Sequence, residues 1–415
     1  MEQMKLFHHV AQAYARADGP LSNADLYRQV ADGAGLTEEE RRRARPVGTA
    51  GEVRNVLQHR IRSIQQTLKQ IGALERTPER GEWVLTKHRK TELHVAGPDL
   101  AVVAFSTDLG IAIWSSWERV IPRLDEPAGL FFFSPPYALR QSRSYGNPRL
   151  SEYVDFLTRA AEPAAENLME GGSLLINLPN DLFEPGSPAR STFLERTIIA
   201  IEDRLGLELM DRAPWINTSK APGPLQWSSR TRQQLNVAYE HQIWFCKNAK
   251  ACRADNRRVL QPHSPRHQKL IDTGGEKRTA SFGDGAYRIR PGSFGQHTEG
   301  KIPRNVFLAG HNCPDLREYR RDAKALGIPP NAAPMPISLA RFWIQFLTEE
   351  NDMVVDTFGG RITTGKAAEE LRRRWLVTER VMEYVMAAAG RFKRSASGFQ
   401  MGEWFEKAFA LRNVI

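Results

Sequence analysis

The sequence contains no run of apolar residues as long as a membrane-spanning helix, and it has few cysteines. Residues 1–19 mix His, Gln, Arg and Asp with apolar residues, unlike the hydrophobic region of a signal peptide. The three cysteines, Cys246, Cys252 and Cys313, do not have the spacing of metal ligands. We therefore expect a soluble protein with free thiols in a reducing compartment, without a membrane partner or a bound metal.

Acidic residues are also in deficit. The 415 residues include 48 Asp and Glu against 58 Lys and Arg, a formal net charge of +10. This excess favours a polyanionic partner, and charge alone leaves nucleic acid, acidic proteins and anionic membranes open. The length allows two domains.

The stretch Leu130-Phe-Phe-Phe-Ser-Pro-Pro-Tyr137 predicts a buried strand that runs into a rigid turn. On its own, Pro135-Pro136 indicates a turn that ends the strand and has no further function. Such a turn, however, presents backbone carbonyls beside the hydroxyl of Ser134 and the ring of Tyr137. Two acceptors and an aromatic face suit the amino group of a flat heterocycle.

A second stretch, Asp352-Met-Val-Val-Asp356-Thr-Phe-Gly-Gly-Arg-Ile-Thr-Thr-Gly365, predicts another short strand. The strand ends in an acidic residue and a glycine-containing turn, before a helix at 366–376. Small residues and free backbone N–H groups at such a turn allow a cofactor to approach closely.

Together the two stretches resemble the S-P-P-Y turn and the D-P-F-x-G-S-G-T-T loop of the DNA amino-methyltransferases that use S-adenosylmethionine. The catalytic turn precedes the cofactor loop, which is similar to the order in the beta class of that family. The resemblance runs from about residue 100 to 392. It implies an α/β fold with a doubly wound, Rossmann-like methyltransferase sheet, a flipped target base in double-stranded DNA, and an assembly that is plausibly a homodimer.

The resemblance also implies roles for individual residues. Ser134, Pro135, Pro136 and Tyr137 would form the catalytic turn, with Tyr137 stacked on the base and the Ser134 hydroxyl and Pro135 carbonyl accepting its amino hydrogens. The cofactor-binding residues implied are Asp108, Asp356, Phe358, Gly359, Gly360, Arg361, Thr363, Thr364 and Glu379. Of these, Glu379 would accept the ribose hydroxyls, and Thr363 and Thr364 would bind the carboxylate.

The second stretch departs from the family pattern at three positions. Thr357 stands where the family has Pro, and Arg361-Ile362 replaces Ser-Gly. Because Ile lacks the backbone freedom of Gly, we expect a different turn or weaker binding, for which Arg361 would compensate by pairing with the cofactor carboxylate. A catalytically degenerate DNA-binding regulator is therefore an open alternative.

We divide the chain into residues 1–94 and residues 95–415. In the first unit, three helices, the third over 52–71, and a hairpin at 73–85 resemble a winged helix-turn-helix; Glu38–Arg45 reads as a solvated connection. DNA contact and a packing role are both open for this unit. The second unit alternates helix and strand, as a doubly wound sheet does. In it, Asp108 either lies near the adenine of the cofactor or caps a helix over 111–120.

Residues 247–304 break this alternation, with thirteen Lys or Arg against five Asp or Glu counted along the sequence. We expect an inserted target-recognition region, and a flexible insert is the alternative. Two arginines in a loop after the catalytic turn add to the expected DNA-binding residues, which are Arg140, Arg143, Arg257, Arg258, Arg266, Lys269, Arg288 and Arg290.

The target amino group is the 4-amino group of cytosine or the 6-amino group of adenine. Ser at position 134 modestly favours cytosine by the resemblance. Methylation of RNA or protein is a further alternative. With a DNA substrate we expect a cytoplasmic, bacterial nucleoid-associated enzyme, belonging to a restriction-modification pair or acting as an orphan methylase, because the chain shows no nuclease signature.

Overall fold

One mixed sheet of ten strands organises the protein. The computed structural model describes residues 3–17, 19–47, 52–70, 74–85, 93–138, 148–329 and 335–412. The strand order is β14-β10-β11-β9-β8-β15-β16-β7-β6-β17. The strands are β6 (Ala101–Ser106), β7 (Gly110–Ser115), β8 (Ala128–Phe133), β9 (Leu168–Leu178), β10 (Glu208–Ile216), β11 (Tyr239–Cys246), β14 (Phe307–Leu308), β15 (Met353–Asp356), β16 (Arg374–Glu379) and β17 (Gln400–Met401).

The middle of this sheet is parallel. Strands β7, β16, β15, β8 and β9 all run in one direction, whereas β6 and β11 run against their neighbours. Strand β15 pairs beside β8, with Val354 opposite Leu130 and Val355 opposite Phe131. The end of β8 and the end of β15 therefore lie at the same edge of the sheet, although about 220 residues separate them in the sequence.

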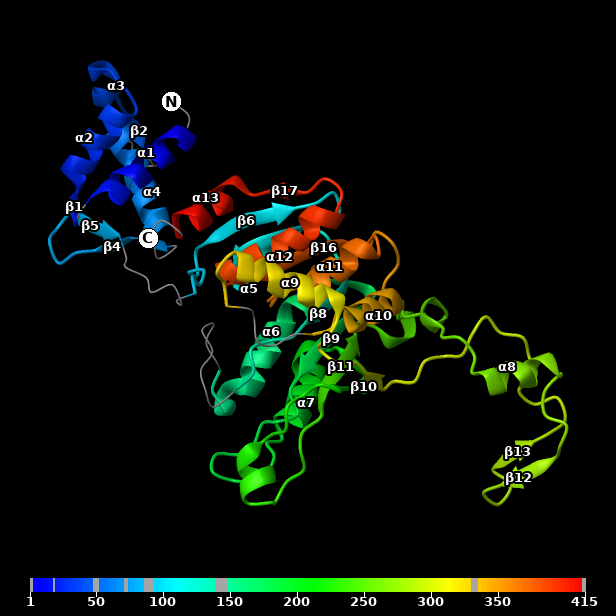
Figure 1. Cartoon of the computed structure of the whole chain (residues 1–415). Helices are drawn as coiled ribbons and strands as arrows, with labels where there is room; N and C mark the ends of the chain where they lie inside the picture. The colour runs from blue at the N-terminus through cyan, green and yellow to red at the C-terminus, as the bar shows by residue number, and fades with distance from the viewer. Residues whose placement is uncertain are drawn as a thin grey trace.

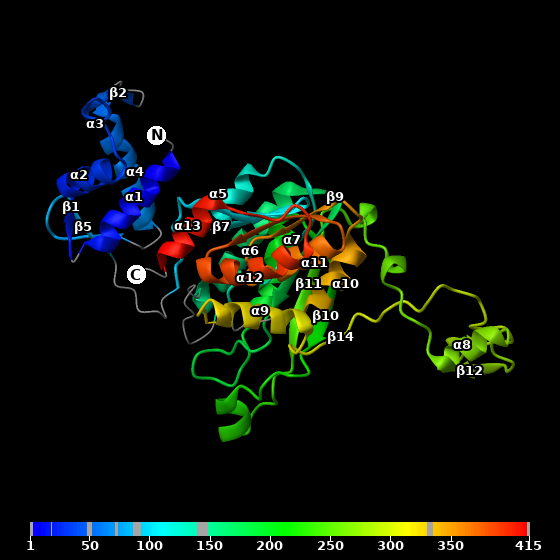
Figure 2. The ribbon, with the colours of Figure 1, turned by 45° about the horizontal axis from the view of Figure 1, so that its top comes forward.

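Helices cover both faces of the sheet (Figures 1 and 2). One face packs against α9 (Pro314–Ala325), α10 (Ile337–Leu347), α11 (Thr363–Glu370) and α12 (Met382–Ser395), and the other against α6 (Tyr153–Asn167) and α7 (Phe193–Leu205). Successive side chains of β8 alternate between the two cores: Leu130 and Phe132 join the first, Phe131 and Phe133 the second. The apolar run is thus buried on both faces, as expected of a parallel strand, and the doubly wound fold is confirmed.

The helix predicted over residues 111–120 is wrong. Residues Gly110–Ser115 form β7, and only Trp117–Val120 are helical, as α5. The side chains of Ala112 and Trp114 are fully buried, and those of β-branched Ile111 and Ile113, which alternate with them, are half-buried. This alternation has a period of two, which suits a half-buried strand and not a helix.

The N-terminal unit contains three main helices and a small sheet. The helices α1 (Gln3–Arg16), α2 (Asn23–Gly33) and α4 (Val56–Gln70) accompany a sheet of β1 (Leu21–Ser22), β5 (Glu82–Leu85) and β4 (Leu74–Arg76). The Ser22 hydroxyl accepts a hydrogen bond from the Asp25 amide and caps α2. The winged-helix assignment and the domain boundary at residue 94 stay predictions.

Two local expectations in this unit are wrong. Residues Glu38–Arg42 form the helix α3, because Thr37 and Glu40 make a reciprocal capping box at its start. The third helix begins at Val56 and not at residue 52, because β3 (Glu52–Asn55) pairs with β2 (Ala44–Val47).

An arm projects from the body between β11 and β14. We define the arm as residues 261–301, because a bridge between Gln261 and Lys301 closes its base. It carries α8 (Pro265–Asp272) and the hairpin of β12 (Ala280–Phe282) and β13 (Tyr287–Ile289), which both views show well away from the sheet (Figures 1 and 2). Among the described residues, no helix is long and apolar enough to span a membrane.

Candidate active site

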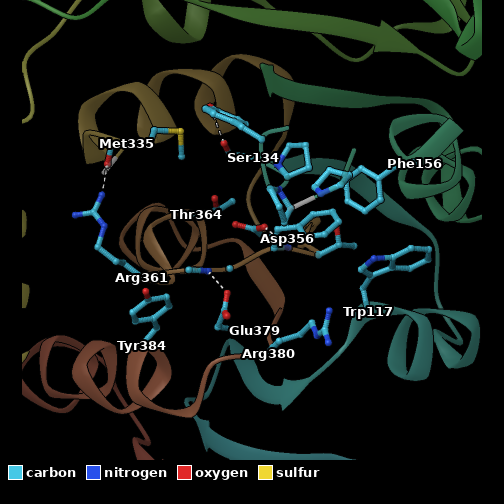
Figure 3. A pocket seen from close by; sticks show the side chains of 18 of the residues that line it. Trp117, Ser134, Phe156, Met335, Asp356, Arg361, Thr364, Glu379, Arg380 and Tyr384 are labelled. Atoms are coloured by element: carbon cyan, nitrogen blue, oxygen red, sulfur yellow. Dashed lines mark hydrogen bonds between the residues drawn. The ribbon is translucent and has the colours of Figure 1, made fainter. Parts of the chain in front are cut away.

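The two stretches singled out in the sequence line one cavity. Its volume is about 430 Å³, and it lies at the edge of the sheet where β8, β15 and β16 end. Figure 3 shows Ser134 and Asp356 on neighbouring sides of it, with Glu379 below them. The predicted residues that line the cavity are Ser134, Pro135, Pro136, Tyr137, Asp356, Phe358, Gly359, Gly360, Arg361, Thr363, Thr364 and Glu379.

The catalytic turn is held by hydrogen bonds to the neighbouring strands. The Tyr137 hydroxyl donates to Oε2 of Glu240 at 2.9 Å, and it lies 3.2 Å from Oγ of Ser134. The amide nitrogen of Asn177 donates to the Tyr137 hydroxyl at 2.7 Å and to Ser134 Oγ at 3.2 Å. Because Asn177 lies one residue before the end of β9 and Glu240 is the second residue of β11, the register of these two strands positions the turn.

Burial dominates the electrostatics of this network. It raises the pKa of Tyr137 well above its ordinary value, and the nearby Glu240 carboxylate adds to the shift. Burial also raises the pKa of Glu240, although the hydrogen bond from Asn177 opposes it. Tyr137 therefore stays a neutral hydrogen-bond donor.

Two carboxyl groups lie beside the cofactor loop, one buried at Asp356 and one half-buried at Glu379. The Asp356 carboxylate accepts a hydrogen bond from the Phe358 amide at 2.9 Å. The two oxygens of Glu379 accept from the amides of Gly360 at 2.6 Å and Val381 at 2.7 Å. Burial raises the pKa of Asp356 to about 7 and that of Glu379 to about 7. Neither carboxylate has an ion-pair partner among the described residues, so a ligand with cationic or hydroxyl groups would find both available.

The turn between these carboxyl groups requires glycine at one position. A Cβ on Gly359 would lie 2.3 Å from a side-chain carbon of Val377, which is closer than any real contact. The turn therefore packs directly onto β16, and it leaves its outer side to the cavity.

Ile362 stands where the family has glycine, and it adopts a backbone conformation that glycine favours. Ile362 adopts the left-handed conformation, with φ 56° and ψ 37°, at the N-cap of α11. For a β-branched residue this conformation costs about 1–2 kcal/mol. Its side chain is fully buried in the core, and this burial offsets the strain. The expectation of a different turn or of weaker cofactor binding stays a prediction.

Arg361 points along the cavity wall. Its guanidinium donates to the Met335 carbonyl at 3.0 Å and lies 5.6 Å from the ring centroid of Tyr319. Figure 3 shows it opposite Trp117 and Phe156. It is almost fully buried and makes no ion pair within the described part of the chain, and burial lowers its pKa to about 10.

The start of α11 offers further donors to the cavity. The Oγ1 of Thr363 is buried and lacks a hydrogen-bond partner in the described structure. Ile362 provides no side-chain cap for the first turn of this helix. Orphan donors beside a helix N-terminus, with an uncompensated guanidinium, fit the carboxylate of an amino acid moiety.

Asp108 does not join the site. It lies in the turn before β7, where its amide donates to the Ser397 carbonyl, whereas Asp356 and Glu379 follow the opposite ends of their strands. The acidic residue that does line the cavity after β7 is Glu118, on α5. Because β7 occupies most of the segment expected as a helix, Asp108 neither caps such a helix nor lines the cavity, which lies at the other end of the strand.

The predicted DNA-binding residues fall into three groups. Arg140 and Arg143 lie outside the described residues. Arg258 is used internally, since its guanidinium donates to the Arg253, Phe346 and Thr348 carbonyls and to Glu349, and Arg257 makes two bonds to Asp255. Arg258 therefore fastens the base of the arm to the body, and its contact with DNA stays a prediction.

The other four basic residues lie on the arm and are exposed: Arg266, Lys269, Arg288 and Arg290. Two exposed aromatic residues, Phe282 and Tyr287, face each other across the β12–β13 hairpin beside them. Mixed cationic and aromatic side chains on a projecting hairpin suit a nucleic acid. Within the described residues, no cluster of three or more His, Cys, Asp or Glu is placed to hold a metal ion.

Sequence reasoning missed Asn177, Glu240 and Gln242. They lie in strands whose other positions are mostly apolar, and Asn177 and Gln242 are buried. A polar residue in a strand that is otherwise buried was the available signal, because such a group needs a partner.

Comparison with known proteins places the chain among DNA-modifying enzymes. A family model described as DNA methylase matches residues 128–390, a span that contains both loops of the cavity. The type II methyltransferase M.PvuII of Proteus hauseri is 34% identical over 290 residues, 70% of this chain and 85% of that protein. The solved structure of a PvuII DNA methyltransferase, described as cytosine-N4-specific, superposes with a TM-score of 0.56 at 27% identity, over 76% of this chain and 96% of that chain.

Proposed function

Because the chain belongs to the DNA methylase family, whose N6/N4 model covers both cavity loops, we propose that it methylates the 4-amino group of cytosine in double-stranded DNA. It is a DNA amino-methyltransferase that uses S-adenosylmethionine. The observation that carries the proposal is the single cavity that joins the Ser134–Tyr137 turn to the Asp356 loop.

The chain provides complementary groups for the ribose and the methionine part of the methyl donor, which would supply an electrophilic methyl on sulfur when bound. The Glu379 carboxylate accepts the ribose hydroxyls, since each of its oxygens is already aligned by a backbone amide. Thr363, Thr364 and Arg361 bind the carboxylate of the methionine part. Asp356 and the backbone of Gly359 and Gly360 flank the same part, and Phe358 packs beside it.

The target base leaves the duplex, because its amino group is otherwise paired and stacked. Ser134 Oγ and the Pro135 carbonyl accept the two amino hydrogens, and the Tyr137 ring stacks on the base. These contacts turn the nitrogen lone pair toward the methyl group. Positioning in a dry cavity then accounts for most of the rate, and no covalent enzyme intermediate is required.

Cytosine is favoured over adenine by two observations. The turn begins with Ser134, and the relative with the 0.56 TM-score is described as cytosine-N4-specific. Adenine N6 is the alternative, because both bases present the same pair of amino hydrogens.

DNA binding is assigned to the arm. Arg266, Lys269, Arg288 and Arg290 contact phosphates or guanine edges, and Arg140 and Arg143, which follow the catalytic turn in the sequence, add further contacts to DNA. Arg257 adds charge at the base of the arm. The same proposal includes a homodimer and a winged-helix role for residues 1–94. It also includes the absence of a bound metal and a cytoplasmic, nucleoid-associated location.

The test is to incubate the purified protein with isotope-labelled S-adenosylmethionine and unmodified DNA, and to identify the labelled nucleoside by mass. We expect N4-methylcytosine. N6-methyladenine would make the base assignment wrong. DNA binding without transfer would support the degenerate regulator, and label in RNA or protein but not in DNA would overturn the substrate.

A further inference from the structure

A chain of hydrogen bonds leads from the catalytic turn into the interior. It runs from Ser134 Oγ to the Tyr137 hydroxyl, at 3.2 Å, and from there to Oε2 of Glu240, at 2.9 Å. Glu240 does not line the cavity. A buried carboxyl group two hydrogen bonds behind the reacting position has no role in binding either the base or the methyl donor.

The carboxylate determines the direction of this chain. The Tyr137 hydroxyl has one hydrogen, which it donates to Glu240. Toward Ser134, the phenolic oxygen can therefore only accept, and Ser134 must donate its own hydrogen to Tyr137. One lone pair of Ser134 Oγ accepts from Asn177, and the other is left for an amino hydrogen of the target base.

Two amide side chains hold the carboxylate in place. Gln242 donates to the amide oxygen of Asn177, so the Asn177 nitrogen faces the network. That nitrogen donates to Oε2 of Glu240 at 2.8 Å, and also to Tyr137 and Ser134. With its oxygen engaged by Gln242, the Asn177 side chain donates its two N–H hydrogens, which are shared among the three acceptors, with Ser134 the most distant at 3.2 Å. This supports the same direction.

Few charged groups lie near Glu240, and two of them shift its pKa in opposite directions. Lys220 lies near Glu240 and pairs with Asp181 at 3.3 Å, so the two act on Glu240 in opposite directions. Tyr153 is the other titratable group near the Tyr137 hydroxyl. Glu240 itself has no ion-pair partner among the described residues, and its raised pKa makes it a better proton acceptor than an exposed carboxylate.

We propose that Glu240 is a positioning residue that keeps Ser134 an acceptor and takes up, through Tyr137, the proton that the target amino group loses. The inference rests on the proposed function. As the nitrogen–carbon bond forms, the carbon–sulfur bond breaks and its electron pair stays on sulfur. The amino group, which then has one proton too many, gives a proton to Ser134 Oγ; the Ser134 proton passes to Tyr137, and the Tyr137 proton passes to Glu240.

The direct test compares Glu240→Gln with the intact enzyme. Glutamine keeps the size and an acceptor oxygen for Tyr137, but it cannot take a proton. We expect kcat to fall about 100-fold, with KM for the methyl donor and the affinity for DNA within twofold. The pH–rate profile of the intact enzyme falls at acidic pH as Glu240 is protonated, and this fall is absent in Glu240→Gln.

Two further variants separate a relay from a structural role. Glu240→Asp keeps a carboxylate and should recover part of the rate and the acidic fall. In Tyr137→Phe the link is broken, so adding Glu240→Gln to it should cost little more. An active enzyme whose Glu240→Gln variant keeps the full rate and the acidic fall overturns the inference and leaves the proposed function standing. An equal rate loss in Glu240→Asp and Glu240→Gln, with weakened donor binding, also overturns it. An intact enzyme without transfer to DNA overturns both.

Discussion

The cavity and the arm are built in opposite ways. In the cavity, Ser134, Asp356 and Glu379 are buried or half-buried, and each is held by hydrogen bonds from fixed strands or backbone amides. On the arm, four basic side chains are exposed and make no ion pair within the described residues. The cavity depends on the exact positions of a few groups, and the arm depends on the sum of its charges. Single substitutions should therefore have large effects on methyl transfer in the cavity and graded effects on DNA binding in the arm.

The largest effect is expected at Ser134. Ser134→Ala removes the acceptor for the amino group and should lower the rate of transfer by about 100- to 1000-fold. Donor binding, measured by calorimetry, should stay unchanged, because Ser134 lies on the opposite loop from Asp356. A variant with full single-turnover rate would remove the catalytic assignment of the turn.

The arm should respond in proportion to the charge removed. Replacing Arg266, Lys269, Arg288 and Arg290 together with Ala should weaken DNA binding by about 10- to 100-fold at moderate salt, and each lost phosphate contact should reduce the salt slope by about 0.9. Arg204→Ala is the control, because its exposed guanidinium lies on α7, outside the arm, and pairs with Asp155 at 2.8 Å. If the control weakened DNA binding as much as the fourfold variant, the assignment of DNA binding to the arm would be wrong.

The strained turn gives a third comparison. Ile362→Gly restores the family's residue and relieves the left-handed strain, but it removes a fully buried side chain from the core. Burial outweighs strain, so we expect a loss of about 2 kcal/mol in the free energy of unfolding. A variant more stable than the intact protein in urea denaturation would show that strain dominates.

The smallest effect concerns pH. The pKa of Asp356 and that of Glu379 are each raised to about 7, and a bound donor with cationic groups and ribose hydroxyls favours both carboxylates in the ionised form. Donor affinity should therefore rise about three- to tenfold between pH 6 and pH 8. Asp356→Asn should flatten this dependence, and a dependence of the opposite sign in calorimetry would contradict the assignment.

The same shifts bear on the stability of the protein without ligand. Because the folded pKa is raised, the contribution of each carboxyl group to stability is full below its unfolded pKa of about 4 and is lost as pH rises through about 7. The melting temperature of the ligand-free protein should therefore fall as pH rises through about 7. Added methyl donor should make this fall smaller.

Local patterns in the sequence predicted much of this architecture. The apolar run before Ser134, the run before Asp356 and the helix Phe193–Leu205 are each specified by neighbours along the chain. Turn residues such as Pro135 and Gly359 act on their own backbone, so their consequences could be read directly. The segment 111–120 failed because its alternating pattern was overlooked.

Other features depended on contacts between distant segments. Glu240 reaches Tyr137 because β11 pairs with β9 in one register, and a shift by one residue would turn it to the other face. Arg258 was indistinguishable in sequence from Arg266, and only folding gave it four acceptors. The sequence by itself therefore determined the two loops and their chemistry, because propensity and turn geometry are local. The tertiary structure alone decided their shared cavity, the Glu240 network and the free side chains of the arm, because pairing register and burial are set by residues far apart in the chain.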